Sequence, residues 1–152
     1  MIRRKLLWAG LFALLSLFIS ARLFAQADVI EQRQKLMKGN GAAAKAIKKA
    51  VEEKDYATVE AKAKDIMENG DKVLDLFPKG STSEKSRALP AIWEKWDEFS
   101  KNPGKVKKAA SELADAARAK DDAAVTVKVK ALGDACGACH KPFRAEKKKS
   151  GG

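Results

Sequence analysis

Cys136, Cys139 and His140 lie within five residues of one another, in the stretch ACGACHKPFR (135–144). They are the two cysteines and the single histidine of a 152-residue chain. On a helix, positions i, i+3 and i+4 project from one face. Two thiols one turn apart can add to the two vinyl groups along one edge of a porphyrin, and the imidazole that follows can then bind the iron. The spacing predicts one covalently attached haem c.

The same three side chains are open to three other interpretations, and the first two need features that this sequence does not offer. A thioredoxin-like redox pair needs a βαβ setting and a helix N-terminus that lowers a thiol pKa. A zinc site needs a fourth ligand, for which only carboxylates are left. A chance pattern in a hydrophobic core is the third alternative. Because the histidine is taken by iron, general acid–base catalysis has no candidate, and we expect no enzyme.

The first 27 residues read as a signal peptide. Arg3, Arg4 and Lys5 precede an apolar run over 6–19, and Ala25-Gln26-Ala27 gives the small-x-small pattern of a cleavage site. An uncleaved membrane anchor is the alternative, although the apolar run is shorter than the roughly 20 residues that span a bilayer. We therefore expect export to the periplasm, with cleavage that leaves no stable membrane anchor.

The chain is basic, with a formal charge of +11, to which the predicted signal peptide contributes four positive residues and no acid. Outside the cytoplasm, such a surface favours acidic redox partner proteins or an anionic membrane surface over nucleic acid. Solvated helix faces would also explain the charge. The sequence predicts one domain over 28–146, followed by a disordered basic tail over 147–152.

Apolar residues three and four positions apart predict helices over 28–53 and 56–77, with Asp55 as the cap between them. The breaker-rich stretch 78–90 predicts the main loop. The rhythm then continues from Pro90 to Ala117 through Asn-Pro-Gly, which favours one helix bent at Pro103 over two separate helices. A last helix covers 125–143. These elements predict an all-α, antiparallel four-helix bundle with the haem in its core.

Three stretches together resemble the class II c-type cytochromes, which form the cytochrome c-prime family of four-helix haem proteins. They are VIEQRQKLMKGNG near residue 28, LPAIW with Phe99 six residues after the tryptophan, and CGACHKPFR at the end. They occur in the family's order and cover nearly all of 28–146. The resemblance implies a monohaem protein, often a homodimer that pairs through its first two helices.

The resemblance also implies roles for single residues. Cys136 and Cys139 match the thioether anchors, and His140 matches the proximal iron ligand. Arg144 stands where the family has a basic residue near the haem, although it could be an ordinary exposed arginine. Arg33 matches an arginine beside a haem propionate, and its place on the apolar stripe of the first helix also favours an anionic partner.

Met37 lies one turn beyond Arg33, at the position that faces the distal side of the haem in this family. In low-spin members a methionine here binds iron, which raises the reduction potential. In high-spin members the iron stays five-coordinate and binds gases such as nitric oxide or carbon monoxide. A methionine on an apolar stripe can also be plain core. KGNGAAAKAI and LFPKGS resemble the methionine-ligated branch, so we expect a His/Met-ligated single-electron carrier, with gas binding as the alternative.

Further expectations concern the surroundings of the haem. Trp93 resembles a family tryptophan that packs near the haem, whereas Trp96, Phe99 and Tyr56 are expected in the core. Gly39 and Gly41 weaken a helix by roughly 1 kcal/mol each, so close approach of the haem or a local break in the helix should explain them. Pro142 departs from the family pattern and is expected to bend the last helical turn.

Overall fold

The computed structural model describes residues 2–83 and 86–146, with side chains from residue 27 onward. The predicted tail over 147–152 lies outside the described residues. The described part contains helices and no β-strand, in the order α1 (Ile2–Glu52), α2 (Tyr56–Lys72), η1 (Leu74–Leu76), α3 (Ala91–Glu94), α4 (Trp96–Phe99), α5 (Asn102–Arg118) and α6 (Asp122–Phe143).

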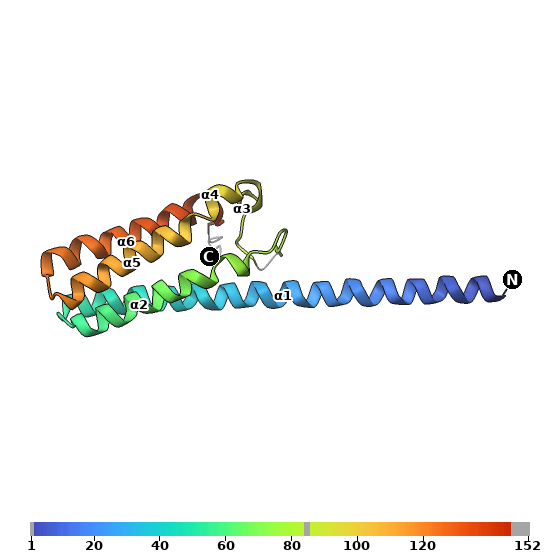
Figure 1. The fold of residues 1–152 in the computed structure, drawn as a ribbon, viewed down its shortest axis with the longest axis horizontal. Helices are drawn as coiled ribbons and strands as arrows, with labels where there is room; N and C mark the ends of the chain where they lie inside the picture. Colours follow the sequence, from blue (N-terminus) through green and yellow to red (C-terminus); the bar gives the residue numbers. More distant parts are fainter. Residues whose placement is uncertain (1, 84–85, 147–152) are drawn as a thin grey trace, which may run out of the picture.

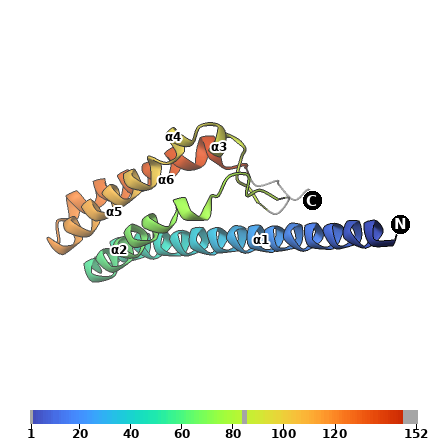
Figure 2. The same ribbon diagram turned by 45° about the vertical axis from the view of Figure 1, so that its right-hand side comes forward.

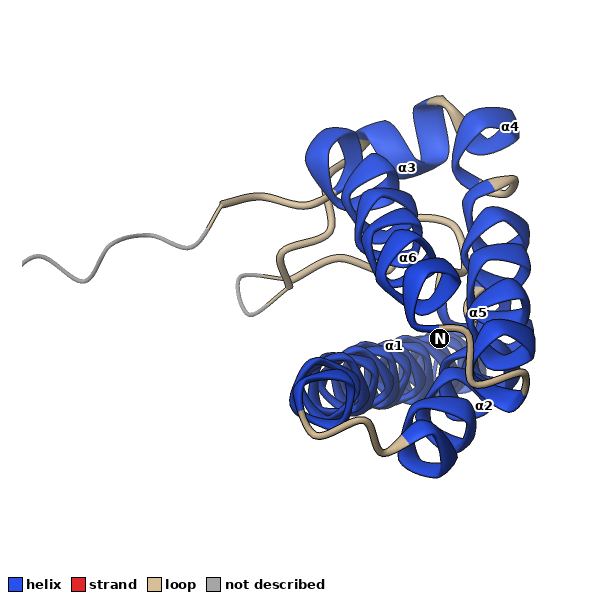
Figure 3. Ribbon diagram, turned by 90° about the vertical axis from the view of Figure 1, so that its left-hand side faces the viewer, coloured by secondary structure: helices blue, strands red, loops and turns tan. Residues whose placement is uncertain are grey.

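The four long helices run alternately up and down and form an antiparallel bundle, as predicted (Figure 1). Seen along α1, the pair α1 and α2 lies on one side and the pair α5 and α6 on the other (Figure 3). Figure 2 shows the α5–α6 pair diverging from α1 toward the end of the bundle that carries α3 and α4. The cysteines of α6 lie toward that same end.

Helix α1 runs without a break from Ile2 to Glu52, so the predicted signal peptide and the first bundle helix share one helical backbone. Its N-terminal half extends beyond the other helices (Figure 1). Cleavage after Ala27 stays a prediction. Among the described residues, no helix combines the length and the apolar character that crossing a membrane requires.

The turns between the long helices have side-chain caps. Asp55 Oδ1 accepts a hydrogen bond from Thr58 N at 3.0 Å at the start of α2, as predicted. Asp121 Oδ1 accepts one from Ala124 N at 2.9 Å at the start of α6. Each cap satisfies a backbone donor that the first turn of a helix leaves unpaired.

The prediction of one helix from Pro90 to Ala117, bent at Pro103, was wrong, because these residues form the three helices α3, α4 and α5. Lys95, with φ −119° and ψ 46°, leaves the helical region between α3 and α4. Pro103 stands in the first turn of α5, where its missing N–H costs no hydrogen bond. Asn102 at the start of α5 connects this helix to α4, because its Nδ2 donates to the α4 carbonyls of Glu98 at 2.9 Å and Phe99 at 3.2 Å.

A cluster of aromatic side chains closes the end of the bundle near α3 and α4. The Phe99 ring lies 4.9 Å from that of Phe77 and 5.3 Å from that of Phe143, both edge-on. Phe99 is buried as predicted, but Trp96 is 38% exposed, so its assignment to the core was wrong. Tyr56 is half-buried and packs against the core that the four long helices share.

Candidate haem site

A cavity of about 390 Å³ lies among the four long helices. Its walls are mostly apolar, with Ile47 from α1, Ile66 from α2, Val106 from α5 and Leu132 from α6. Cavities of this size and character are typical of cofactor sites between the helices of a bundle.

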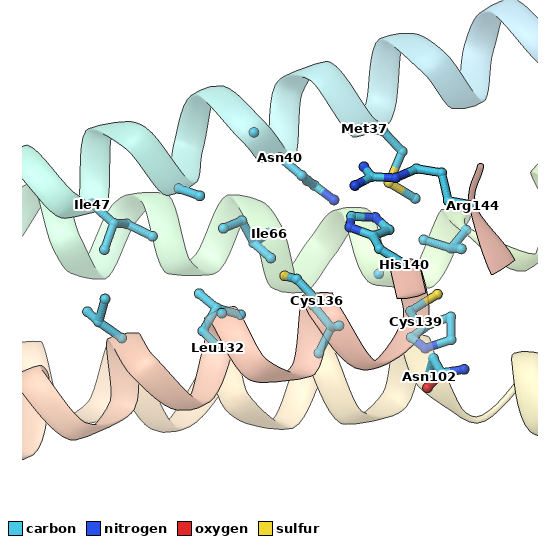
Figure 4. Close-up of a pocket in the computed structure, with 18 of the residues that line it drawn as sticks. Met37, Asn40, Ile47, Ile66, Asn102, Leu132, Cys136, Cys139, His140 and Arg144 are labelled. Carbon is cyan, nitrogen blue, oxygen red and sulfur yellow. The ribbon is translucent and has the colours of Figure 1, made fainter. Parts of the chain in front are cut away.

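Helix α6 brings Cys136, Cys139 and His140 together on one wall of this cavity, as their spacing predicted (Figure 4). Both thiols are free and half-buried. Gly133, one turn before Cys136, also lines the cavity, and a Cβ atom there would meet nothing within 4 Å. Pro142 lies inside α6, which continues to Phe143, and a bend of the last turn at Pro142 stays a prediction.

Burial controls the protonation of these side chains. It raises the pKa of Cys136, and it raises the pKa of Cys139 to about 11. Both thiols are therefore neutral at physiological pH, the opposite of what a thiol–disulfide oxidoreductase requires. The pKa of His140 is lowered, first by burial and then by the charges of Arg144 and Arg87. Its imidazole is neutral, as an iron ligand must be.

A short pairing of two chain segments fixes the backbone just after His140. Leu89 N donates to Phe143 O at 3.1 Å, and Ala145 N donates to Arg87 O at 2.8 Å. The Arg87 guanidinium also donates twice to Ala145 O, at 2.9 and 2.7 Å. This pairing holds Arg144, whose side chain lines the cavity beside His140 (Figure 4).

Helix α1 supplies the wall opposite His140. Met37 extends from it toward the His140 imidazole (Figure 4), and Asn40, Gly41 and Ala44 line the same wall. Gly41 thus faces the cavity, whereas Gly39 lines a groove on the outer surface. The helix has no break at either glycine, so the expected local break is absent.

Arg33 and Trp93 lie outside the cavity lining. Arg33 is 4% exposed and donates to Ser81 Oγ at 3.0 Å, Ser81 O at 2.5 Å and Ser86 Oγ at 2.7 Å. Trp93 Nε1 donates to the carbonyls of Phe77 at 3.2 Å and Pro78 at 3.0 Å. Contacts of these two side chains with a haem propionate and a haem edge remain predictions.

Sequence reasoning missed several residues of the site. Asn40 lies three positions after Met37, a spacing that would have placed it on the same face. Arg87 and Asn102 carry no local signal, because they reach the site through chain pairing and a helix junction that are set by the tertiary fold.

The cavity fits a covalently bound haem. It offers apolar walls for the porphyrin, two free thiols one turn apart for its vinyl groups, and a neutral imidazole beside them for its iron. Among the described residues that line it there is no carboxylate, so the site is not built for a hard cation.

Comparison with known proteins agrees with this geometry. The family model for cytochrome c' matches residues 28–144. Cytochrome c-556 of Agrobacterium tumefaciens (strain II Chrys) is 36% identical over 124 residues, which cover 80% of this chain and 100% of that protein. Cytochrome c' of Rhodopseudomonas palustris is 35% identical over 127 residues, covering 81% and 86%.

Solved structures show the same fold. Cytochrome c' from Thermochromatium tepidum superposes with a TM-score of 0.74 at 27% identity, covering 80% of this chain and 97% of that one. Cytochrome c' from Rhodopseudomonas palustris superposes with a TM-score of 0.72 at 32% identity, covering 80% and 98%. The chain therefore belongs to the cytochrome c' family and carries covalently attached haem c.

Proposed function

We propose that this protein is an exported, monohaem electron carrier of the periplasm whose haem iron is bound by His140 and Met37. The observation that carries the proposal is the placement of these two side chains on facing walls of one cavity (Figure 4). The haem supplies a one-electron redox couple, and His/Met ligation raises its reduction potential. The protein has no enzyme activity of its own in this proposal.

Each group of residues has a defined part in holding the cofactor. Cys136 and Cys139 form thioethers with the porphyrin edge, and His140 binds the iron from the α6 side. The apolar walls limit the access of water to the metal and so help to set its reduction potential. Arg144 places a positive charge beside the proximal histidine. In this proposal, Arg33 contacts a haem propionate and Trp93 packs near the haem edge.

The alternative function is gas binding by five-coordinate haem iron. A solved structure of a cytochrome c' variant from Alcaligenes xylosoxidans is a nitric oxide complex, at 21% identity and a TM-score of 0.72. In the present chain, Met37 would then be one more apolar side chain of the distal wall. The favoured function and the alternative thus differ only in what occupies the sixth position of the iron.

The optical spectrum separates the two functions. A low-spin spectrum of the wild type in both oxidation states, which becomes high-spin in Met37→Ala, is the result expected for the electron carrier. Met67→Ala is the matched control, because Met67 is half-buried in the core and is absent from the cavity lining. A high-spin wild type that binds carbon monoxide readily would exclude ligation by Met37.

The partners follow from charge and shape. Lys48 and Arg144 line the cavity, so an acidic redox protein would meet positive charge where it approaches the haem. An outer groove between α1 and α2 carries small residues, Gly39, Ala42, Ala43 and Ala46, which allow a second helix to approach closely. We therefore propose a homodimer in which the α1–α2 pair of a second copy packs against this groove. A solved cytochrome c' with 27% identity and a TM-score of 0.73 shows ligand-controlled dimer dissociation.

A further inference from the structure

Asn40 is a polar residue in the wall that carries Met37. It lies on α1, and its side chain lines the cavity with its amide directed toward the side of His140 (Figure 4). Asn69 on α2 donates its Nδ2 to Asn40 Oδ1 at 2.8 Å. Since this bond engages the oxygen of the Asn40 amide, the NH₂ group is the end that faces the cavity.

The cavity that this NH₂ group faces is lined mostly by apolar side chains, and its charged lining residues, Lys48 and Arg144, are donors that cannot accept a hydrogen bond from Asn40. Ile47, Ile66 and Val73 line the same cavity, and no carboxylate is among its described lining residues. A hydrogen-bond donor in such surroundings acts more strongly than it would in water. A donor beside the sixth position of haem iron stabilises the negative charge that builds up on a bound diatomic gas.

We propose that the amide pair Asn40–Asn69 is a hydrogen-bond donor on the distal side of the haem, which strengthens the binding of a diatomic gas when the sixth position of the iron is open. Asn40 makes the contact, and Asn69 orients it. The inference rests on the haem site of the proposed function and holds whether or not Met37 binds iron. If Met37 does bind, the pair sets how well a gas competes with its thioether.

Carbon monoxide is the probe, bound to the reduced haem protein in the Met37→Ala background, where the sixth position is open. The readouts are the C–O stretching frequency in the infrared and the dissociation rate. Replacing Asn40 by leucine, which has a similar shape and no donor, is expected to raise the stretching frequency. Dissociation should become about two- to tenfold faster, the change that corresponds to one ordinary hydrogen bond.

Asn69→Asp tests the orienting role. A carboxylate only accepts hydrogen bonds, so it would turn the Asn40 amide round and bring its oxygen to the cavity. The stretching frequency should then rise at least as far as in Asn40→Leu. Glu68→Gln is the control, because Glu68 is next to Asn69 but is exposed on the outer groove, and no change is expected.

An unchanged or lowered stretching frequency in Asn40→Leu would overturn the inference, provided that the variant keeps its haem and its helical circular dichroism. The test is independent of Met37 ligation, which the wild-type spectrum decides. If the wild type is itself five-coordinate, the same comparison is made without the Met37→Ala change.

Discussion

Arg33 is a buried charge whose hydrogen-bond acceptors, within the described part of the chain, are oxygens of serine side chains and of the backbone. Its guanidinium donates to Ser81 and Ser86 of the main loop and lies 4.8 Å from the centre of the Phe77 ring. Burial lowers its pKa, but arginine stays charged at any accessible pH. The side chain therefore fixes the loop to α1 and keeps a positive charge at this end of the bundle.

Arg33→Leu is expected to destabilise the protein by about 2–4 kcal/mol, because Ser81 is buried and its oxygens would lose their donors. Urea unfolding of the haem protein measures the change. Lys35→Leu is the control, since Lys35 lies two residues further along the same helix and is exposed. Equal stability of Arg33→Leu and wild type would contradict this role.

At the same scale, the sequence predicts residues that act through local spacing and misses those that act through distant contacts. Cys136, Cys139 and His140 share a wall because positions on one helix have fixed relative directions. Arg33 lies on the buried stripe as predicted, but its bonds reach serines 48 and 53 residues away. No local pattern encodes such partners, and the same holds for Asn69 opposite Asn40.

Gly39 and Gly41 lie on different faces of helix α1, which lets their functions be separated. Neither would bring a Cβ atom within 4 Å of another group, but only Gly41 lines the haem cavity. Gly39→Ala should stabilise the protein by about 1 kcal/mol through helix propensity and leave the haem spectrum unchanged. Gly41→Leu should perturb the spectrum, because its side chain enters the space of the cofactor.

Denaturant unfolding and optical spectra of the two variants check this pair of expectations. Gly39→Leu is the size-matched control for Gly41→Leu. An unperturbed spectrum in Gly41→Leu would show that the haem does not approach this part of α1.

The first turn of α6 is joined to the α1–α2 turn by a charged group. Asp122 accepts hydrogen bonds from Lys54 Nζ at 2.7 Å and from Tyr56 Oη. The hydrogen bond from Lys54, followed by that from Tyr56, lowers the pKa of Asp122. The hydrogen bond to Asp122 in turn raises the pKa of Lys54. The contribution to stability is therefore complete above the unfolded pKa of aspartate, about 3.9, and is lost as the pH falls through the lower folded value.

Asp122→Asn should therefore lower the Tm at neutral pH, and the difference from wild type should shrink as the pH falls below about 4. Thermal unfolding followed by circular dichroism across this range is the measurement. Asp134→Asn provides the control, because its partner Lys130 lies on the same helix and links no second element. A difference in Tm that is independent of pH would argue against the ionic contribution.

At the scale of elements, helix periodicity predicts which segments are helical better than where they are interrupted. The four long helices follow from apolar spacing, and Asp55 caps α2 as its type suggests. The break at Lys95 leaves no trace in that spacing, since the apolar positions continue in phase on both sides. Packing of Ile92 and Phe99 into the aromatic end of the bundle is a tertiary effect.

The whole molecule has an arrangement that a periodic sequence predicts well. Four amphipathic segments joined by mostly short turns have few ways to bury their apolar stripes other than an antiparallel bundle. The divergence of α5–α6 from α1 (Figure 2) depends on the packing of specific side chains. The extent of the cavity and the lining residues that α2 and α5 contribute therefore became clear only in the structure.

Self-association through α1 and α2 is the prediction that belongs to the molecule as a whole. The outer groove between these helices has small residues on α1 and charged residues of both signs, Lys62, Asp65 and Glu68, on α2. A copy related by a two-fold axis would present the same small residues and complementary charges. Ala42 is exposed in this groove, so Ala42→Glu should place bulk and charge at the contact and shift the protein to monomer.

Sedimentation velocity of the haem protein at several concentrations distinguishes the two states. Ala123→Glu is the matched control, because Ala123 is also exposed but lies on α6 and is absent from the α1–α2 groove. The association should weaken only in Ala42→Glu, while both variants keep the wild-type haem spectrum. The prediction would be contradicted if the wild type sediments as a monomer at all concentrations. It would also be contradicted if both substitutions leave a dimer intact, because no second copy would then bind at this groove.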